Sequence, residues 1–222
     1  MSEASTSWRD QAVARSLDSA RSRAETRVQR FLDAAFELMA DGDRPDFTVQ
    51  EVVERSGQSL RSFYQYFGGK HELLLALFEE SVRSTAAHLE EAIAEADAPA
   101  ERLHRFVVEY YRLCRPVGTE RASGAAGRVM VEFAQKLLTS HPADAARVFS
   151  PLVALFEGLL DEAAAAGALR TGIDHRSVAG TVLEVVMFNA FAATIGGAPL
   201  KPDATAAAEE LWDLVFHGIG AG

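Results

Sequence analysis

Closely spaced start and stop signals for helices between residues 48 and 69 constrain this chain more than any other feature. Thr48 and Glu51 fit the capping box, in which each side chain bonds the other residue's backbone N–H, so a helix begins here. Ser56-Gly57 can end that helix because glycine adopts the left-handed conformation. Ser59 can cap a second helix, which Gly68-Gly69 ends. Two helices of about seven residues joined by a glycine-containing turn are typical of a helix-turn-helix.

A longer helix before this motif supplies a surface on which the two short helices can pack. Over residues 24–40 the apolar side chains recur at helical spacing and form one face. They are Val28, Phe31, Leu32, Ala35, Leu38 and Met39. We expect Phe63 and Phe67 to be buried against this face. The three-residue turn forces a steep crossing, so the side chains expected to project outward are Leu60, Arg61, Ser62, Tyr64 and Gln65.

The remainder of the chain has helical periodicity throughout. We expect helices over residues 71–96, 100–114, 122–139, 143–166, 175–195 and 203–217, separated by segments that contain proline or glycine. Alternating runs of valine and isoleucine bounded by turn signals are absent, so we expect essentially no strand. The predicted fold class is all-α with about nine helices, counting the three that come first.

The pattern predicts three parts. Residues 1–23 lack an apolar period and contain Arg9, Arg15, Arg21 and Arg23, so we expect a flexible polar arm. The alternative is an arm that contacts DNA phosphates or a minor groove. Residues 24–70 form a three-helix domain with the helix-turn-helix at about 48–67, and residues 71–222 form a larger helical domain.

The net charge of −10 is unevenly distributed along the chain. Residues 1–70 hold ten Lys or Arg and eleven Asp or Glu, which leaves −9 on residues 71–222. An acidic whole therefore does not exclude nucleic-acid binding by the first third. The single cysteine, Cys114, fits a reducing compartment. Because neither a signal peptide nor an apolar run long enough for a membrane span is found, we expect a cytoplasmic protein without a membrane partner.

The segment from Phe47 to Leu73 resembles the DNA-binding segment of TetR-type (tetracycline-repressor-like) bacterial regulators. The shared elements are the capping Thr48, the Ser56-Gly57 turn, the Ser59 cap and the run Ser-Phe-Tyr-Gln-Tyr-Phe-Gly-Gly-Lys-His-Glu-Leu over residues 62–73. Gln58 stands where the family usually has a small aliphatic residue. The resemblance implies a homodimer, formed by the last two helices, that binds a palindromic operator and releases it when a small molecule enters the C-terminal domain. We expect a transcriptional repressor that a small, lipophilic effector releases from its operator, with activation as the alternative.

The residues expected to contact DNA lie in and around the second short helix. Arg61 can reach guanine O6 and N7 with its fork, while Lys70, at a helix N-terminus, can meet a phosphate. Thr48 and Ser59 are expected to cap the two short helices, and their hydroxyl groups are also candidates for contacts with DNA phosphates. The complete set is Thr48, Gln58, Ser59, Leu60, Arg61, Ser62, Tyr64, Gln65, Tyr66 and Lys70.

Bulky apolar residues of the C-terminal domain suggest a cavity for a lipophilic effector. The candidates are Phe106, Tyr110, Cys114, Met130, Phe133, Leu137, Phe156, Met187, Asn189 and Phe191, although each could be ordinary core and Asn189 could equally lie in a dimer interface. The last two helices have more apolar surface than one face needs, which predicts burial on two sides. The residues expected at the dimer interface are Val178, Val182, Val185, Leu211, Leu214 and Val215.

Two other classes of protein are weighed against a regulator. An all-α enzyme is disfavoured because Gly68-Gly69-Lys70 lacks the first glycine of a P-loop and His71-Glu72 lacks the second histidine of a zinc-protease helix. The histidines have no metal-ligand spacing, so we expect neither a metal nor a cofactor. A helical small-molecule or lipid-binding protein without DNA activity would not need the constellation from Thr48 to Lys70.

Overall fold

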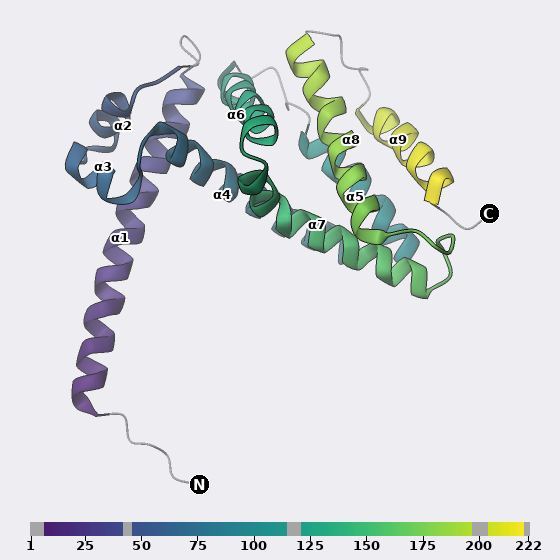
Figure 1. The fold of residues 1–222 in the computed structure, drawn as a ribbon, viewed down its shortest axis with the longest axis horizontal. Helices are drawn as coiled ribbons and strands as arrows, with labels where there is room; N and C mark the ends of the chain where they lie inside the picture. The colour runs from purple at the N-terminus through teal and green to yellow at the C-terminus, as the bar shows by residue number, and fades with distance from the viewer. Residues whose placement is uncertain (1–6, 42–45, 115–120, 197–203, 220–222) are drawn as a thin grey trace. The chain divides into compact units, whose positions relative to one another are not determined.

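The computed structural model describes residues 7–41, 46–114, 121–196 and 204–219, and the chain divides into two compact units, Met1–Ala76 and Leu77–Gly222. Within the described ranges the regular elements are nine α-helices and no strand, which confirms the all-α prediction (Figure 1). They are α1 (Trp8–Ala40), α2 (Val49–Ser56), α3 (Leu60–Tyr66), α4 (Lys70–Ile93), α5 (Pro99–Cys114), α6 (Arg121–Ser140), α7 (Pro142–Ala165), α8 (His175–Gly196) and α9 (Ala204–Ile219). The boundary between the units falls inside α4, after Ala76 rather than after residue 70 as we expected.

The first unit is held together by aromatic side chains from α1 and α3. The ring of Phe31 meets that of Phe63 edge-on, with centroids 5.4 Å apart, and that of Phe67 at 6.1 Å. Phe31 and Phe63 are completely buried, and Phe67 is nearly so. Because α3 has only seven residues, it is too short to be stable alone, and this packing holds it in place.

The N-terminal half of α1 differs from our expectation. Residues 8–23, predicted as part of a flexible arm, continue the helix that begins at Trp8, while residues 1–6 lie outside the described part of the chain. The stretch has no glycine or proline and is rich in alanine and arginine, which are strong helix formers. It also extends an already nucleated helix, which costs much less than starting one. The lack of an apolar period correctly indicated that this half has no packing partner within its own unit.

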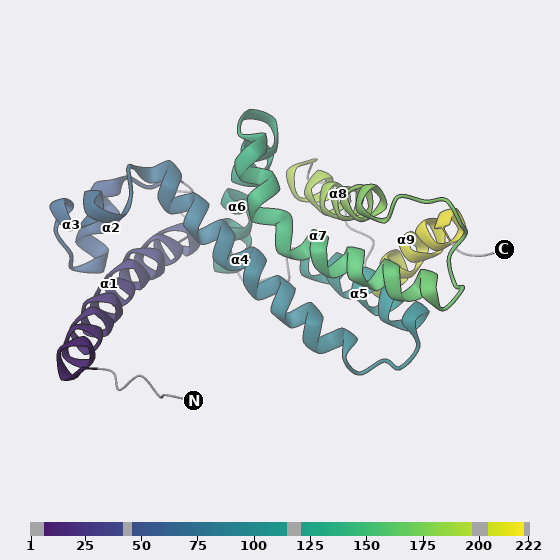
Figure 2. The same cartoon turned by 60° about the horizontal axis from the view of Figure 1, so that its bottom comes forward.

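The second unit is built around α5, which packs against α7, α8 and α9 (Figures 1 and 2). Its centre is the stacked pair Phe106 and Phe156, with ring centroids 4.7 Å apart. On α9, Trp212 is buried, stacks on Phe216 at 4.8 Å and meets the ring of His104 edge-on at 5.2 Å. The helix bounds agree with the predicted ranges to within about three residues outside α1, the largest difference being α4.

Candidate functional site

The geometry at the start of α2 is the predicted capping box. The hydroxyl oxygen of Thr48 accepts a hydrogen bond from the backbone N–H of Glu51 at 3.2 Å, and the Glu51 carboxylate accepts one from the backbone N–H of Thr48 at 2.7 Å. Gly57 ends α2 in the left-handed conformation, with φ of 66°. Because this conformation is strained for residues with a Cβ, Gly57 sets the direction in which the chain enters α3.

A second cap and two buried rings fix the orientation of α3. The hydroxyl oxygen of Ser59 accepts a hydrogen bond from the backbone N–H of Ser62 at 3.1 Å. Phe63 points into the core, so the opposite side of α3 faces outward. The exposed side chains on that side are Leu60, Arg61, Tyr64 and Gln65, whereas Gln58 and Tyr66 are half-buried.

Arg61 has no ion pair among the residues that the structure describes. By contrast, Arg55 at the end of α2 is paired with Asp41 at 2.8 Å and Glu37 at 3.3 Å, which ties α2 to α1. These pairs raise the pKa of Arg55, chiefly through the hydrogen bond to Asp41. Arg61 is therefore the guanidinium that the motif leaves available for an outside partner.

Two of the residues expected to contact DNA, Ser62 and Lys70, face or contact their own unit. The hydroxyl of Ser62 is buried and has no hydrogen-bond partner in the described part of the chain, so it does not project outward as expected. Lys70 is already engaged within its own unit. Its ammonium contacts the carboxylate of Asp46, donates to the carbonyl oxygen of Phe47 at 2.5 Å and lies 4.2 Å from the centroid of the Phe47 ring.

The Lys70 contact has a clear electrostatic effect on its partner. The hydrogen bond from Lys70 lowers the pKa of Asp46 below its usual value, and the nearby positive charge adds to this. A phosphate would therefore have to compete with Asp46 for the ammonium group. The sequence offered no signal for this pair, because the two residues are 24 positions apart.

In the second unit, a cavity of about 540 Å³ lies among α5, α6, α7 and α8. Its apolar lining includes Tyr110, Leu138, Phe149, Val153, Leu183 and Met187, and its polar lining includes Glu157, Arg176 and Glu184. Arg176 and Glu184 are exposed. The size and the mixture of apolar walls with a few polar groups are typical of a small-molecule site.

The cavity includes only two of the predicted effector residues, Tyr110 and Met187. Phe106, Phe133, Leu137 and Phe156 are buried in the core instead, and Met130 is half-buried away from the cavity lining. Phe191 lies in the part of α8 whose side chains fall outside the described residues. The space exists because small residues face it, and these are Ala145, Ala146, Ala154 and Gly180. A search of the sequence for small residues on neighbouring helices could have located it.

Two other predicted effector residues, Asn189 and Cys114, make hydrogen bonds to tyrosines of α5. Asn189 is exposed and its side-chain oxygen accepts a hydrogen bond from the Tyr111 hydroxyl at 3.3 Å. Burial of the Cys114 thiol raises its pKa to about 12, an effect that a hydrogen bond with Tyr110 partly offsets. Burial also raises the pKa of Tyr110. A raised pKa keeps the Cys114 thiol protonated near neutral pH, whereas the thiolate is the nucleophilic form.

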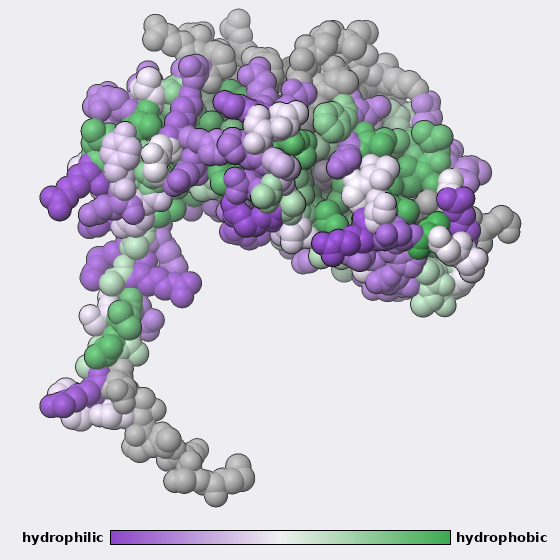
Figure 3. Space-filling model, viewed as in Figure 1, coloured by the Kyte–Doolittle hydropathy of each residue, from purple (hydrophilic) through white to green (hydrophobic). Residues whose placement is uncertain are grey.

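The residues predicted at the dimer interface divide into two groups. Val182 and Leu211 are buried within a single chain, so they contribute to its own core rather than to a free surface. Val185 and Leu214 are 44% and 72% exposed, and Val178 and Val215 are half-buried. Figure 3 shows hydrophobic side chains gathered at the surface over α8 and α9. An apolar surface of this kind is typical of a protein–protein contact.

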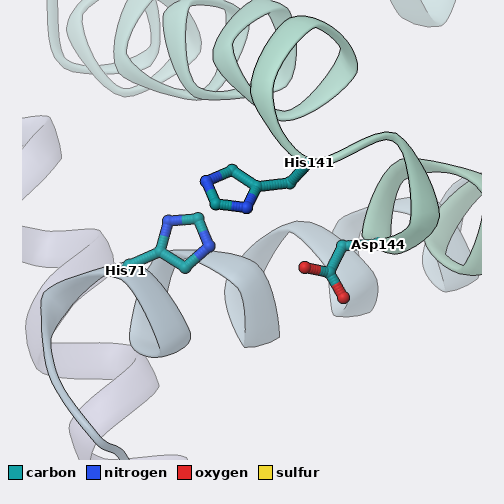
Figure 4. Close-up of side chains that lie close together, drawn as sticks. All are labelled: His71, His141 and Asp144. Carbon is teal, nitrogen blue, oxygen red and sulfur yellow. The ribbon is translucent and has the colours of Figure 1, made fainter.

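The histidines lie mostly beside surface carboxylates or near helix ends. His104 contacts Glu209 at 2.6 Å and His88 contacts Glu109 at 3.2 Å, joining α5 to α9 and α4 respectively. Figure 4 shows His141 just before α7 and Asp144 in the first turn of that helix. Asp144 accepts a hydrogen bond from Arg147 at 3.2 Å. His71, also drawn in Figure 4, is the second residue of α4 and belongs to the first unit. In the described part of the chain, no helix is long and apolar enough to cross a membrane.

Comparison with known proteins places the first unit in a family. Residues 31–77 match the family described as bacterial regulatory proteins, tetR family. The HTH-type transcriptional regulator BetI of Brucella suis is 34% identical over 77 residues, which are 35% of this chain and 39% of BetI. The match thus spans well under half of that relative. The fatty acid metabolism regulator protein of Bacillus subtilis is 22% identical over 168 residues, covering 72% of this chain and 81% of the relative.

Solved structures extend the likeness of the fold to both units. The crystal structure of the transcriptional regulator FadR from Bacillus subtilis in complex with stearoyl-CoA matches with a TM-score of 0.64 and 18% identity, over 86% of this chain and 98% of that one. A bacterial regulatory protein in the tetR family from Rhodococcus RHA1 matches with a TM-score of 0.60 and 21% identity, over 88% and 98%. The helix-turn-helix domain at residues 31–77 thus matches the tetR family of bacterial regulatory proteins, and the fold of both units is similar to that of a solved structure from this family.

Proposed function

We propose that this chain is a sequence-specific transcriptional regulator, a repressor that leaves a palindromic operator when a lipophilic effector binds. The observation that carries the proposal is the one-sided presentation of α3. Phe63 and Phe67 anchor the helix from within, while Leu60, Arg61, Tyr64 and Gln65 are exposed along its outer side. A helix held in this way can enter a major groove, where an arginine fork reads guanine.

A dimer would explain why the operator is palindromic. Two copies related by a two-fold axis present two α3 helices to successive major grooves, so half-sites about one helical turn apart are expected. The exposed apolar residues Val185 and Leu214 on α8 and α9 offer the surface for such a contact. Joining both helices to those of a second copy would cover side chains that a single chain leaves in water.

The cavity in the second unit is the proposed effector site. Its apolar walls suit an acyl chain, and Arg176 at its lining suits a carboxylate or phosphate headgroup. FadR of Bacillus subtilis, whose fold is similar, forms a complex with stearoyl-CoA. We therefore propose a long-chain acyl compound as the effector class here. The effect can reach the first unit through α4, which is continuous across the boundary between the units.

Selection from random duplex DNA with the full-length protein tests DNA binding. The expected result is an enriched palindrome that Arg61→Ala blurs at one position per half-site, since a bidentate guanine contact is worth about 1–3 kcal/mol of discrimination. Arg83→Ala is the matched control, because Arg83 is an exposed arginine on α4 outside the motif. Absence of any enriched sequence at low salt would contradict the proposal.

A cavity-filling variant tests the effector site. A Cβ added at Gly180 meets no atom within 4 Å, so Gly180→Leu can project into the cavity without a backbone clash. We expect this variant to bind operator normally but to lose release by stearoyl-CoA, whereas Gly158→Leu, on the exposed side of α7, keeps both. Coenzyme A alone and stearate alone show which part of the ligand is recognised. Unchanged release of Gly180→Leu would place the effector elsewhere.

A further inference from the structure

The N-terminal half of α1 is a helix that no other element of the first unit covers. In both views it continues past α2 and α3 (Figures 1 and 2). Trp8 and Leu17 are 73% and 64% exposed, and the first completely buried residue of the helix is Phe31. About four turns of helix are therefore available to a partner outside the chain.

Four of the six arginines of α1 lie on one side of this helix. Arg9, Arg23, Arg27 and Arg30 are separated by 14, 4 and 3 residues. At 3.6 residues per turn these positions fall within an arc of about 60° and along about 30 Å of the helix axis. All four are exposed, and none has an ion pair among the residues that the structure describes. We call these four residues the α1 arginine stripe.

Two acidic residues of the same stretch lie on the other side of the helix. By helical register, Asp18 and Glu25 fall on the half of the helix opposite the stripe. Glu25 is paired at 2.8 Å with Arg21, which also falls outside the stripe. The four arginines of the stripe thus have no ion pair among the described residues, on a protein whose net charge is −10. Such a row of positive charges attracts a linear polyanion.

The stripe ends where α1 enters the packed core of the first unit. Its last member, Arg30, precedes Phe31, whose ring packs on Phe63 of α3. Duplex DNA carries one negative charge per about 1.7 Å of its axis, so each of four guanidinium groups spread over about 30 Å can meet a phosphate. We propose that the α1 arginine stripe binds DNA phosphates beside the operator half-site, which adds affinity without reading sequence. This inference rests on the proposed function, since it needs an operator complex.

The salt dependence of operator binding tests the stripe. The slope of log K against log salt falls by about 0.9 for each phosphate contact that is lost. We expect the double variant Arg9→Gln with Arg23→Gln to reduce the slope by about 2 per bound protomer. The control, Arg15→Gln with Arg21→Gln, removes the same charge from outside the stripe and leaves the slope unchanged. Glutamine keeps the helix propensity in both variants.

A second stripe pair excludes a folding artefact. Arg27→Gln with Arg30→Gln alters the part of α1 next to the packed core, and the same reduction in slope is expected there. Equal slopes for stripe and control variants, or a change in oligomeric state confined to the stripe variants, would overturn the inference. If the unaltered protein selects no DNA sequence, the proposed function itself fails. If it does and the stripe variants keep the original slope, only the inference fails.

Discussion

Replacing Phe63 with alanine should abolish operator binding although this side chain points away from DNA. Phe63 is completely buried, and its ring lies 5.4 Å from those of Phe31 and Phe67. Truncating a buried phenylalanine costs about 3–5 kcal/mol. A loss of about 1 kcal/mol shifts the midpoint of a domain of this size by about 4–8 °C, so the first unit should melt roughly 12 °C lower or more.

The assay must separate the first unit from the second. Hydrogen exchange followed on peptides from residues 47–77, combined with operator affinity, provides this. Gln65→Ala is the control, because Gln65 lies on the same short helix but is exposed, so its effect on stability should stay within about 0.5 kcal/mol. Phe63→Leu should fall between the two, since it keeps most of the apolar volume. Slow exchange and normal melting of Phe63→Ala, or equal damage by Gln65→Ala, would refute the view that the buried rings hold α3.

Changes at four other positions have defined expected outcomes. Thr48→Ala should cost about 1 kcal/mol of stability, and Thr48→Ser should restore most of it, measured by thermal unfolding. Gly57→Ala should cost about 1–2 kcal/mol because its φ of 66° is left-handed; no change in the melting midpoint would contradict this. Since burial raises the pKa of Cys114 to about 12, iodoacetamide at pH ~8 should label it only after unfolding. The same shift means that the unfolded state binds fewer protons between about pH 9 and 12, so the free energy of unfolding should fall as pH rises through that range. Leu214→Arg should lower the dimer fraction in analytical ultracentrifugation, whereas Leu113→Arg, at an exposed leucine on α5, should leave it unchanged.

The local features of the helix-turn-helix could be predicted from sequence because they depend on neighbours in the chain. The Thr48 cap, the Gly57 turn and the Ser59 cap each involve residues a few positions apart, and all are present as expected. The extension of α1 could not be predicted from an apolar period, because this part of the helix has no packing partner in its unit. There, helix propensity and growth from a packed end decide the conformation.

Features that depend on distant parts of the chain were not predictable in the same way. The pairing of Lys70 with Asp46 joins the start of α4 to the segment before α2, and no local pattern marks it. The buried hydroxyl of Ser62 depends on the angle at which α3 meets the core. Large apolar residues are poor indicators of the cavity because they fill space, whereas an opening needs small residues such as Ala154 and Gly180 on facing helices.

The positions of the two tryptophans have a consequence for spectroscopy. Trp8 stands in water at the first residue of α1, whereas Trp212 is buried against Phe216 and His104 in the second unit. Indole emission shifts to the red on exposure to water, so only Trp212 should shift when the protein unfolds. A fluorescence melt would follow the packing of α9 on α5, and the core around Phe31 and Phe63 would contribute no tryptophan signal. Iodide should quench Trp8 selectively. The remaining emission of Trp212 then reports on the second unit alone.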